Sequence, residues 1–159
     1  LAEAGYPNGF ETPFLAYRNR DYAEAMINNL NAVGITAKFE YLKYAAFRDK
    51  VQSGGAPFNF GTWGSYSIND VSAITSHFQS GGKDDYSKDP EVIKQLGIGD
   101  TSVDANVRKA AYKAALSRIS GEAFMFPLWS YNTWYAFSKD VDFNPTPDEI
   151  PRFFTAKWM

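Results

Sequence analysis

The sequence contains no cysteine and only one histidine, His77. The lack of cysteine excludes disulfide bonds, a thiolate nucleophile and cysteine-ligated zinc or iron–sulfur sites. A Ser-His-Asp triad would have to use His77, which lies in a segment without the G-x-S-x-G motif of a nucleophile elbow. We therefore expect His77 to be a structural or surface residue, and we predict no catalytic residue, no metal site and no cofactor.

An excess of positive charge is also lacking. The chain has 16 Lys and Arg residues against 18 Asp and Glu residues, for a net charge of −2. A protein that neutralises phosphates needs a basic surplus, so we expect no nucleic-acid partner. No apolar run approaches the roughly 18 residues of a membrane-spanning helix, and the first residues lack the basic and then apolar pattern of a signal peptide.

The length of 159 residues fits one domain, or a piece of a larger protein, at roughly 150 residues per domain. Residues 1–9 resemble the last turn of a helix that runs into a glycine stop and a proline. We therefore expect this chain to be a piece of a longer protein.

The first half of the chain has the alternating pattern of an α/β fold. Phe10 to Tyr17 is a short apolar run typical of a strand, and Pro13 favours an edge or bulge position. Apolar residues at helical spacing predict a helix over 21–33, which Asn19 or Asp21 can cap and Gly34 can end. Further elements are predicted as a strand over 35–42, a helix over 44–51 and a strand over 58–63.

The second half is predicted to be more helical. We expect helices over 70–78 with Asn69 as cap, over 90–96, and over a long stretch that begins with a capping box at Thr101-x-x-Asp104 and ends at Gly121. Between the first two, residues 81–89 are polar and predict a solvated loop without the spacing of a calcium site. Aromatic residues over 124–138 predict one or two strands, and an irregular tail follows.

Two segments without charged residues, 51–69 and 123–138, both contain tryptophan next to small polar residues. Ligand sites of α/β proteins lie in loops at the carboxyl ends of strands, so these aromatics are candidates for a ligand wall as well as for ordinary core. We expect stacking from Trp63 and Trp129, with Tyr131 beside them, and hydrogen bonding from Ser65, Tyr66 and Asn132. Arg18 and Arg20 follow the first strand and are either solvated charges or a grip on a ligand carboxylate.

Several short motifs follow one another along the chain in a recognisable order. They are Ala4 to Phe10 before a strand, a helix ending at Val33-Gly34-Ile35, Phe47 followed by Ser53-Gly54-Gly55, Gly61-Thr62-Trp63 at a strand end, Tyr86-Ser87 with Asp89-Pro90-Glu91, Arg108 to Tyr112 in a helix, and Phe126-Pro127-Leu128. Their order and spacing resemble the C-terminal part of the peptide/nickel-type solute-binding proteins, family 5, of bacteria.

The resemblance implies one lobe of a type II periplasmic-binding-protein fold, a mixed sheet flanked by helices. Residues 1–141 would form the ligand-binding lobe, and residues 142–159 would be a tail that returns to an N-terminal lobe outside this chain. Such proteins are periplasmic or lipid-anchored receptors of ABC importers. They close two lobes on a small-molecule or oligopeptide ligand and deliver it to a membrane permease without covalent chemistry.

One position departs from the family's pattern. Peptide-binding members commonly have an Asp three residues after the tryptophan that matches Trp63, where it receives the peptide's ammonium group, but this chain has Tyr66 there. A phenol does not supply the compensating charge, so sugars, opine-like compounds or modified peptides become more plausible ligands. If the other lobe is absent, we expect Phe153, Phe154 and Trp158 of the tail to dock on a second copy, as a non-native homo-oligomer, or on an improvised surface.

Two alternatives stay open at this stage. The same aromatics suit a fragment of a carbohydrate-active enzyme, in which they would stack on sugar rings while an Asp/Glu pair performs acid–base chemistry. A purely structural interaction module is the third possibility.

Overall fold

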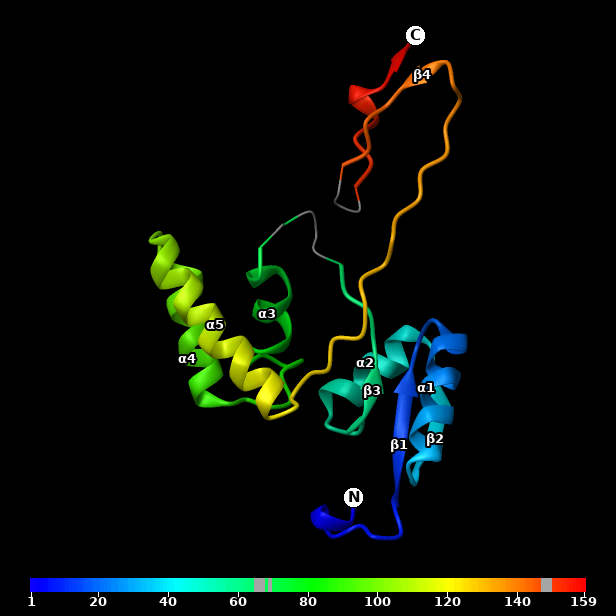
Figure 1. The fold of residues 1–159 in the computed structure, drawn as a ribbon, viewed down its shortest axis with the longest axis vertical. Helices are drawn as coiled ribbons and strands as arrows, with labels where there is room; N and C mark the ends of the chain where they lie inside the picture. Colours follow the sequence, from blue (N-terminus) through cyan, green and yellow to red (C-terminus); the bar gives the residue numbers. More distant parts are fainter. Residues whose placement is uncertain (65–67, 69, 147–149) are drawn as a thin grey trace. The chain divides into compact units, whose positions relative to one another are not determined.

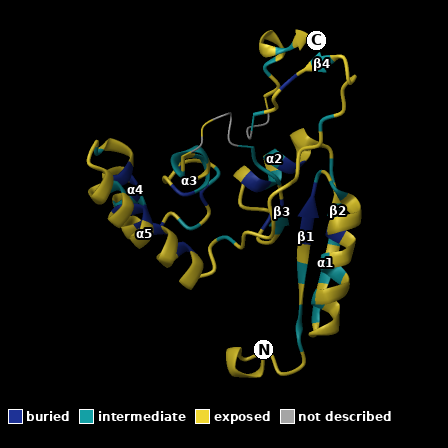
Figure 2. Ribbon diagram, turned by 45° about the horizontal axis from the view of Figure 1, so that its top comes forward, coloured by how far each residue is buried: buried dark blue, intermediate teal, exposed yellow. Residues whose placement is uncertain are grey.

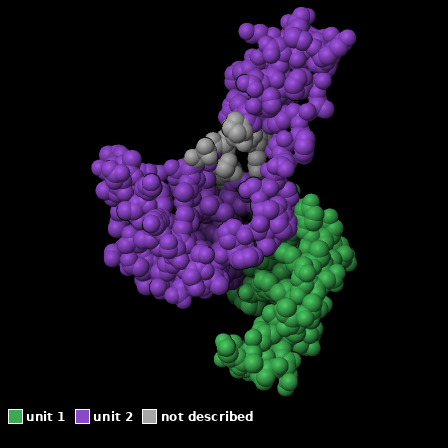
Figure 3. Space-filling model, viewed as in Figure 1, with its two compact units in different colours: residues 1–62 green, residues 63–159 purple. Residues whose placement is uncertain are grey.

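The computed structural model describes residues 1–64, 68, 70–146 and 150–159. It divides the chain into two compact units, Leu1–Thr62 and Trp63–Met159 (Figure 3). We call them unit 1 and unit 2 and describe each by itself. Within the described residues, no helix combines the length and the apolar character needed to cross a bilayer.

Unit 1 is built on a three-stranded parallel sheet (Figure 1). Strand β1 (Phe10–Ala16) lies between β2 (Ile35–Tyr41) and β3 (Asn59–Phe60). Phe10 is in register with Ile35, and Leu15 is in register with Asn59. Helices α1 (Arg20–Ala32) and α2 (Tyr44–Gln52) connect the strands, so the predicted order of strands and helices is confirmed, with a last strand shorter than expected.

The alternation of side chains along β1 gives unit 1 a core on each face of its sheet. Phe14 and Ala16 pack with Ala23 of α1 on one face, whereas Leu15 packs with Phe47 and Val51 of α2 on the other. The carboxyl half of β1 is accordingly the buried part of the strand (Figure 2). Two helices on opposite faces therefore hold the end of β1 in place.

Two details of unit 1 differ from the predictions. β1 is the central strand, not an edge strand, yet Pro13 is accommodated because β3 pairs only with Leu15 and Ala16. Leu15 donates its N–H to the carbonyl of Phe58, and Pro13 faces the same side two residues earlier, where a donor is not required. Asn19 occupies the cap position of α1 without a side-chain cap bond, and its φ of 52° turns the chain from β1 into the helix.

The described residues of unit 2 include the α-helices α3 (Ser72–Phe78), α4 (Pro90–Thr101) and α5 (Ala105–Gly121). Its core is formed by α4 and α5 through Val92, Leu96, Tyr112, Ala115 and Ile119. The helices were predicted, although α3 begins two residues later than expected and α4 extends five residues further. Val71 is the cap residue of α3, and the expected cap, Asn69, lies outside the described residues. The predicted capping box was not correct. Thr101 is the last residue of α4, and Asp104 itself caps α5 by accepting hydrogen bonds from the backbone of Asn106 and Val107.

The loop over residues 81–89 is not the solvated loop that its composition predicts. Asp85 is buried and accepts hydrogen bonds from the backbone N–H groups of Gly81 and Lys88, both at 2.9 Å, and from the hydroxyl of Ser87 at 2.7 Å. Asp89 is buried as well and caps α4. Carboxylates in this loop therefore replace the backbone hydrogen bonds that a regular element would make.

The prediction of strands over 124–138 is wrong for this structure, in which none of these residues belongs to a strand. Aromatic β-propensity reflects packing against a neighbouring strand, and this segment pairs with none. The tail beyond it forms a short antiparallel pair of β4 (Val141–Asp142) and β5 (Lys157–Trp158), with a 3-10 helix at Phe153–Thr155. Phe143 is buried there against the rings of Tyr135, Phe137 and Phe153.

Candidate functional site

The carboxyl edge of the parallel sheet carries the clearest arrangement of polar groups in unit 1. Arg18 follows β1 and Thr62 follows β3, and Arg18 Nη1 donates a hydrogen bond to Thr62 Oγ1 over 3.0 Å. The hydroxyl of Tyr17 donates to the backbone carbonyl of Thr62 over 3.4 Å. Parallel strands end at one edge of a sheet, and that edge is the usual location of ligand sites in α/β folds. We define Tyr17, Arg18 and Thr62 as the sheet-edge cluster.

The sheet-edge cluster has a rigid aromatic support. The Tyr17 ring lies 5.0 Å from the ring of Tyr44 and 4.8 Å from that of Phe47, both in α2. The guanidinium of Arg18 lies 5.8 Å from the centre of the Tyr17 ring, within the range of a cation–π contact. Phe47 is buried in the core, so the position of the Arg18 side chain is tied to packed structure.

The structure separates the two arginines that the sequence left as equivalent candidates. Arg20 Nε pairs with Glu24 Oε1 over 2.7 Å, and its guanidinium lies over the rings of Phe39 and Tyr41. Arg18 is exposed and forms no ion pair with any residue that the structure describes. Arg20 is thus charge-compensated by Glu24, whereas Arg18 has no such partner among the described residues.

Trp63, the first residue of unit 2, is packed against α3. Its indole N–H donates to the carbonyl of Ala73 over 3.2 Å, and its ring stacks on the imidazole of His77 at 3.9 Å with an interplanar angle of 21°. Phe78 meets the indole edge-on at 5.1 Å. Trp63 is half-buried.

The start of α3 is fixed by Asp70. Its carboxylate accepts hydrogen bonds from the backbone of Ser72 at 3.0 Å and from Arg108 Nη2 of α5 at 2.6 Å. The hydrogen bonds from the backbone and hydroxyl of Ser72, followed by the Arg108 guanidinium, hold the pKa of Asp70 below its usual value. The hydrogen bond between Asp70 and Arg108 links the start of α3 to α5, and α3 is the helix against which Trp63 packs.

The remaining predicted site residues fall into two groups. Ser65 and Tyr66 lie outside the described residues. Trp129, Tyr131 and Asn132 are exposed in the extended segment after α5, and the rings of Trp129 and Tyr131 meet edge-on at 6.4 Å. The predicted convergence of the two tryptophan segments stays a prediction.

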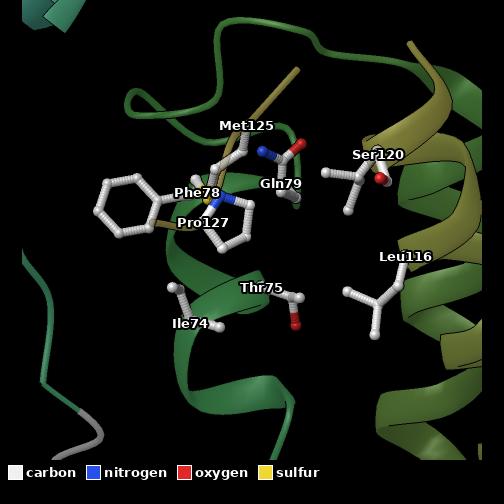
Figure 4. Close-up of a pocket in the computed structure, with 9 residues that line it drawn as sticks. Ile74, Thr75, Phe78, Gln79, Leu116, Ser120, Met125 and Pro127 are labelled. Carbon is white, nitrogen blue, oxygen red and sulfur yellow. The ribbon is translucent and has the colours of Figure 1, made fainter. Parts of the chain in front are cut away.

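A separate apolar cavity lies inside unit 2 (Figure 4). It has a volume of about 220 Å³ and lies between α3 and α5, with Ile74, Phe78 and Leu116 on its walls and Met125 and Pro127 closing one side. None of the predicted ligand-binding residues lines it. Among the described residues, no group of three or more His, Asp or Glu side chains has the arrangement of a metal site.

Comparison with known proteins places this geometry in a wider context. No protein-family model matches the sequence, and no curated protein sequence gives a significant match. Solved structures do match. The dipeptide-binding protein from Pseudoalteromonas sp. SM9913, in complex with Met-Leu, matches all of this chain with a TM-score of 0.79 and 23% identity. The chain has the fold of one part of a family 5 solute-binding protein.

Two further matches support this assignment of the fold. The binding protein AgaA from A. tumefaciens R10, in complex with agropinic acid, is 29% identical over 75% of this chain, with a TM-score of 0.62. HbpA2 from Haemophilus parasuis matches the whole chain with a TM-score of 0.77 and 21% identity. The chain spans 34%, 26% and 34% of the Pseudoalteromonas, AgaA and HbpA2 chains, respectively, which is about a third of a family 5 protein or less.

The comparison agrees with the predicted α/β lobe, because the matched solved structures share its fold. The alternative of a carbohydrate-active enzyme gains no support from these matches. The sequence did not single out Tyr17 or Thr62. Their position just after strands is the signal that could have indicated them, since ligands of open α/β sheets bind at the carboxyl ends of the strands.

Proposed function

We propose that this chain forms part of the ligand-binding lobe of an ABC-importer receptor, which captures a peptide-like or other small organic solute and delivers it to a membrane permease. The observation that carries the proposal is the sheet-edge cluster, in which Thr62 holds an exposed Arg18 at the carboxyl edge of a parallel sheet and no described residue forms an ion pair with this arginine. The likeness to family 5 receptors supports the same reading. As such a receptor, the protein would act in the periplasm or on a lipid anchor outside the cell.

The ligand class follows from the charge of the site. Arg18 offers a fixed guanidinium that suits a carboxylate, because planar N–H donors bind its two oxygens at once. The ligands named for two matched structures, a dipeptide and agropinic acid, both carry an acid group. A solute with a carboxylate and an apolar or aromatic part would use Arg18 together with stacking on Trp63 and Trp129. Tyr131, Ser65, Tyr66 and Asn132 would complete the wall.

The proposed domain organisation assigns residues 1–141 to the lobe and residues 142–159 to a tail that contacts a second lobe. The tail leaves large apolar side chains uncovered, including Phe154 at 85% and Trp158 at 82% exposure. Exposed aromatic patches of this kind mark interaction surfaces. The second lobe would cover them and supply the opposite wall of the ligand cleft.

The proposal is tested by solute binding to the full-length protein. Native mass spectrometry of the protein purified from its source detects a co-purified solute, and calorimetry with Met-Leu and with agropinic acid as probes measures affinity. We expect Trp63→Ala to weaken binding about tenfold or more, and Trp63→Phe to weaken it less, because phenylalanine keeps the stacking face. Wild-type affinity in both Trp63→Ala and Arg18→Ala would refute the site.

A further inference from the structure

The apolar cavity of unit 2 has walls that are held by the packing of the unit. Ile119 of α5 belongs to the buried core that α5 forms with α4, and Met125 packs against the same core. Thr75 of α3 and Gln79 at the end of this helix also line the cavity, and both are buried. A ligand would therefore enter a space that is largely formed before it binds, which is usual for small-molecule sites.

The lining of the cavity favours an apolar occupant over water. Two of its three polar side chains already make hydrogen bonds: Thr75 donates its hydroxyl to the carbonyl of Val71 over 3.0 Å, and Gln79 Oε1 accepts from the hydroxyl of Ser87 over 3.2 Å. The third, Ser120, is exposed to solvent. A water molecule inside a protein needs about two to four polar partners, and walls that are mostly aliphatic and aromatic do not supply them.

The volume and the side chains of the cavity indicate the kind of molecule that fits. The volume is about 220 Å³, and an engineered protein cavity of about 150 Å³ lined by Leu, Ile and Phe side chains binds benzene. Phe78 adds an aromatic ring to the wall, and Met125 adds a thioether, which makes favourable contacts with aromatic rings. A molecule with one ring therefore matches both the size and the chemistry of the walls.

The cavity can be reached from solvent. Ile74 of α3 and Leu116 of α5, which are 40% and 41% exposed, line it from facing helices (Figure 4). A small ring can enter between them without opening the buried core of α4 and α5. Binding would also remove the exposed apolar surface of these two side chains from water, which is favourable.

We propose that this cavity is a second binding site of the protein, which takes a small, uncharged molecule with a single aromatic ring. None of the described residues that line it is charged, so a carboxylate or an ammonium group would lose its hydration there without gaining a partner. The sheet-edge cluster has the opposite chemistry, because Arg18 suits a carboxylate. The cavity site therefore goes beyond the solute capture proposed above and selects a different class of ligand.

The test is the binding of toluene to the full-length protein, followed by NMR of its methyl groups. We expect nuclear Overhauser effects (NOEs) from toluene to the methyl groups of Ile74, Leu116 and Met125, which line the cavity. Leu116→Phe should weaken toluene binding about tenfold or more, because the added ring fills space that toluene needs. Leu116→Ala is the matched variant: it removes the same side chain but enlarges the cavity, so the NOEs to Ile74 and Met125 should remain.

Phe126 provides the control for unspecific binding to exposed aromatic residues. It lies between Met125 and Pro127 in the sequence, but it does not line the cavity, and it is 81% exposed. Phe126→Ala should therefore leave the NOEs from toluene unchanged.

Two results would overturn the proposal. One is toluene that contacts none of the three methyl-bearing residues, as when a side chain from outside this chain fills the cavity in the full-length protein. The other is binding that is as tight in Leu116→Phe as in the wild type. The measurement uses neither Arg18 nor a carboxylate ligand, so the cavity site and solute capture can each fail while the other holds.

Discussion

Arg18 and Thr62 join the ends of two parallel strands that are more than forty residues apart in the sequence, through a hydrogen bond of 3.0 Å between Nη1 and Oγ1. The bond fixes one end of the guanidinium and leaves its other N–H groups directed away from Thr62. An arginine held in this way loses little conformational entropy when it binds a carboxylate. This relationship distinguishes Arg18 from Arg20, which forms an ion pair with Glu24.

The first prediction compares these two arginines. Arg18→Ala should weaken the binding of a carboxylate-bearing probe such as Met-Leu about 10- to 100-fold, the value of a charge-assisted hydrogen bond pair. Arg20→Ala is the matched control and should change affinity by less than about threefold, because it removes an exposed i,i+4 ion pair. Calorimetry on the full-length protein measures both. Equal losses in the two variants would remove the basis for assigning the ligand contact to Arg18.

The second prediction concerns the pair of Asp89 and Arg118. Arg118 donates to Asp89 Oδ1 from Nε at 2.8 Å and to Oδ2 from Nη2 at 2.6 Å, while Asp89 also accepts from the backbone of Glu91 and Val92 at the start of α4. The Arg118 hydrogen bonds and the Val92 N–H lower the pKa of Asp89 to about 2. The carboxylate is thus more acidic in the folded protein than in the unfolded chain.

A lowered folded-state pKa stabilises the protein above the unfolded-state value, and this stabilisation is lost as the pH falls from about 4 towards 2. Asp89→Asn should therefore lower the free energy of unfolding at pH 7, and the difference from the wild type should shrink as the pH approaches 2. Urea unfolding at pH 7, 4 and 2.5 measures it. A difference that is independent of pH would show that the charge of Asp89 does not contribute.

The sequence predicted those parts of the fold whose signals are local. The alternation of apolar residues over 35–42 indicates a strand with one buried face, and the helical spacing over 21–33 indicates a helix with one buried face. The structure contains both elements, as β2 and α1. The strands predicted over 124–138 did not form, because aromatic β-propensity depends on packing against a neighbouring strand and no strand among the described residues pairs with this segment. Trp134, which is 88% exposed, is a residue type that favours strands but here packs against little of the described structure.

The candidate site was predictable only in part. Both arginines were found because they follow a strand, and the spacing of Arg20 and Glu24 already contained the i,i+4 pair that separates them. The contact between Arg18 and Thr62 depends on which strands become neighbours in the sheet, and no local pattern records that. His77 was expected to be a structural or surface residue, because a single histidine carries no spacing signal. Its stacking on the ring of Trp63 depends on the fold and could not be predicted from the sequence.

The third prediction uses two glycines of α4 that differ in their surroundings. A Cβ at Gly99 would lie 2.8 Å from the ring of Tyr112, whereas one at Gly97 would meet no atom within 4 Å. The Tyr112 ring cannot easily move, because it is buried and its hydroxyl donates to Asp100 over 2.6 Å. Burial, followed by this hydrogen bond, raises the pKa of Tyr112 to about 12.

Gly99→Ala should consequently destabilise the protein by about 1 to 3 kcal/mol through overpacking. Gly97→Ala should stabilise it by up to about 1 kcal/mol, because alanine favours the helix and no contact is disturbed. Urea unfolding of both variants at pH 7 gives the two signs. If Gly99→Ala were as stable as Gly97→Ala, the close packing of α4 on α5 at Tyr112 would be wrong.

The last prediction concerns the entry to the parallel sheet. Gly9 precedes β1 with a φ of 78°, and a Cβ there would lie 1.9 Å from the carbonyl oxygen of Gly34, the same oxygen that accepts the N–H of Phe10 at 3.1 Å. In Gly9→Ala the alanine would have to adopt a left-handed backbone, and it would break the first contact between β1 and the chain leading into β2. We expect the free energy of unfolding to fall by about 3 kcal/mol or more.

Gly5 is the matched control. It has a similar φ of 85° but no atom within 4 Å of its Cβ position, so Gly5→Ala should lower the free energy of unfolding by only about 1 kcal/mol. Urea unfolding measures the difference, and equal losses would mean that backbone conformation alone, without the close approach of Gly34, explains the glycine at position 9.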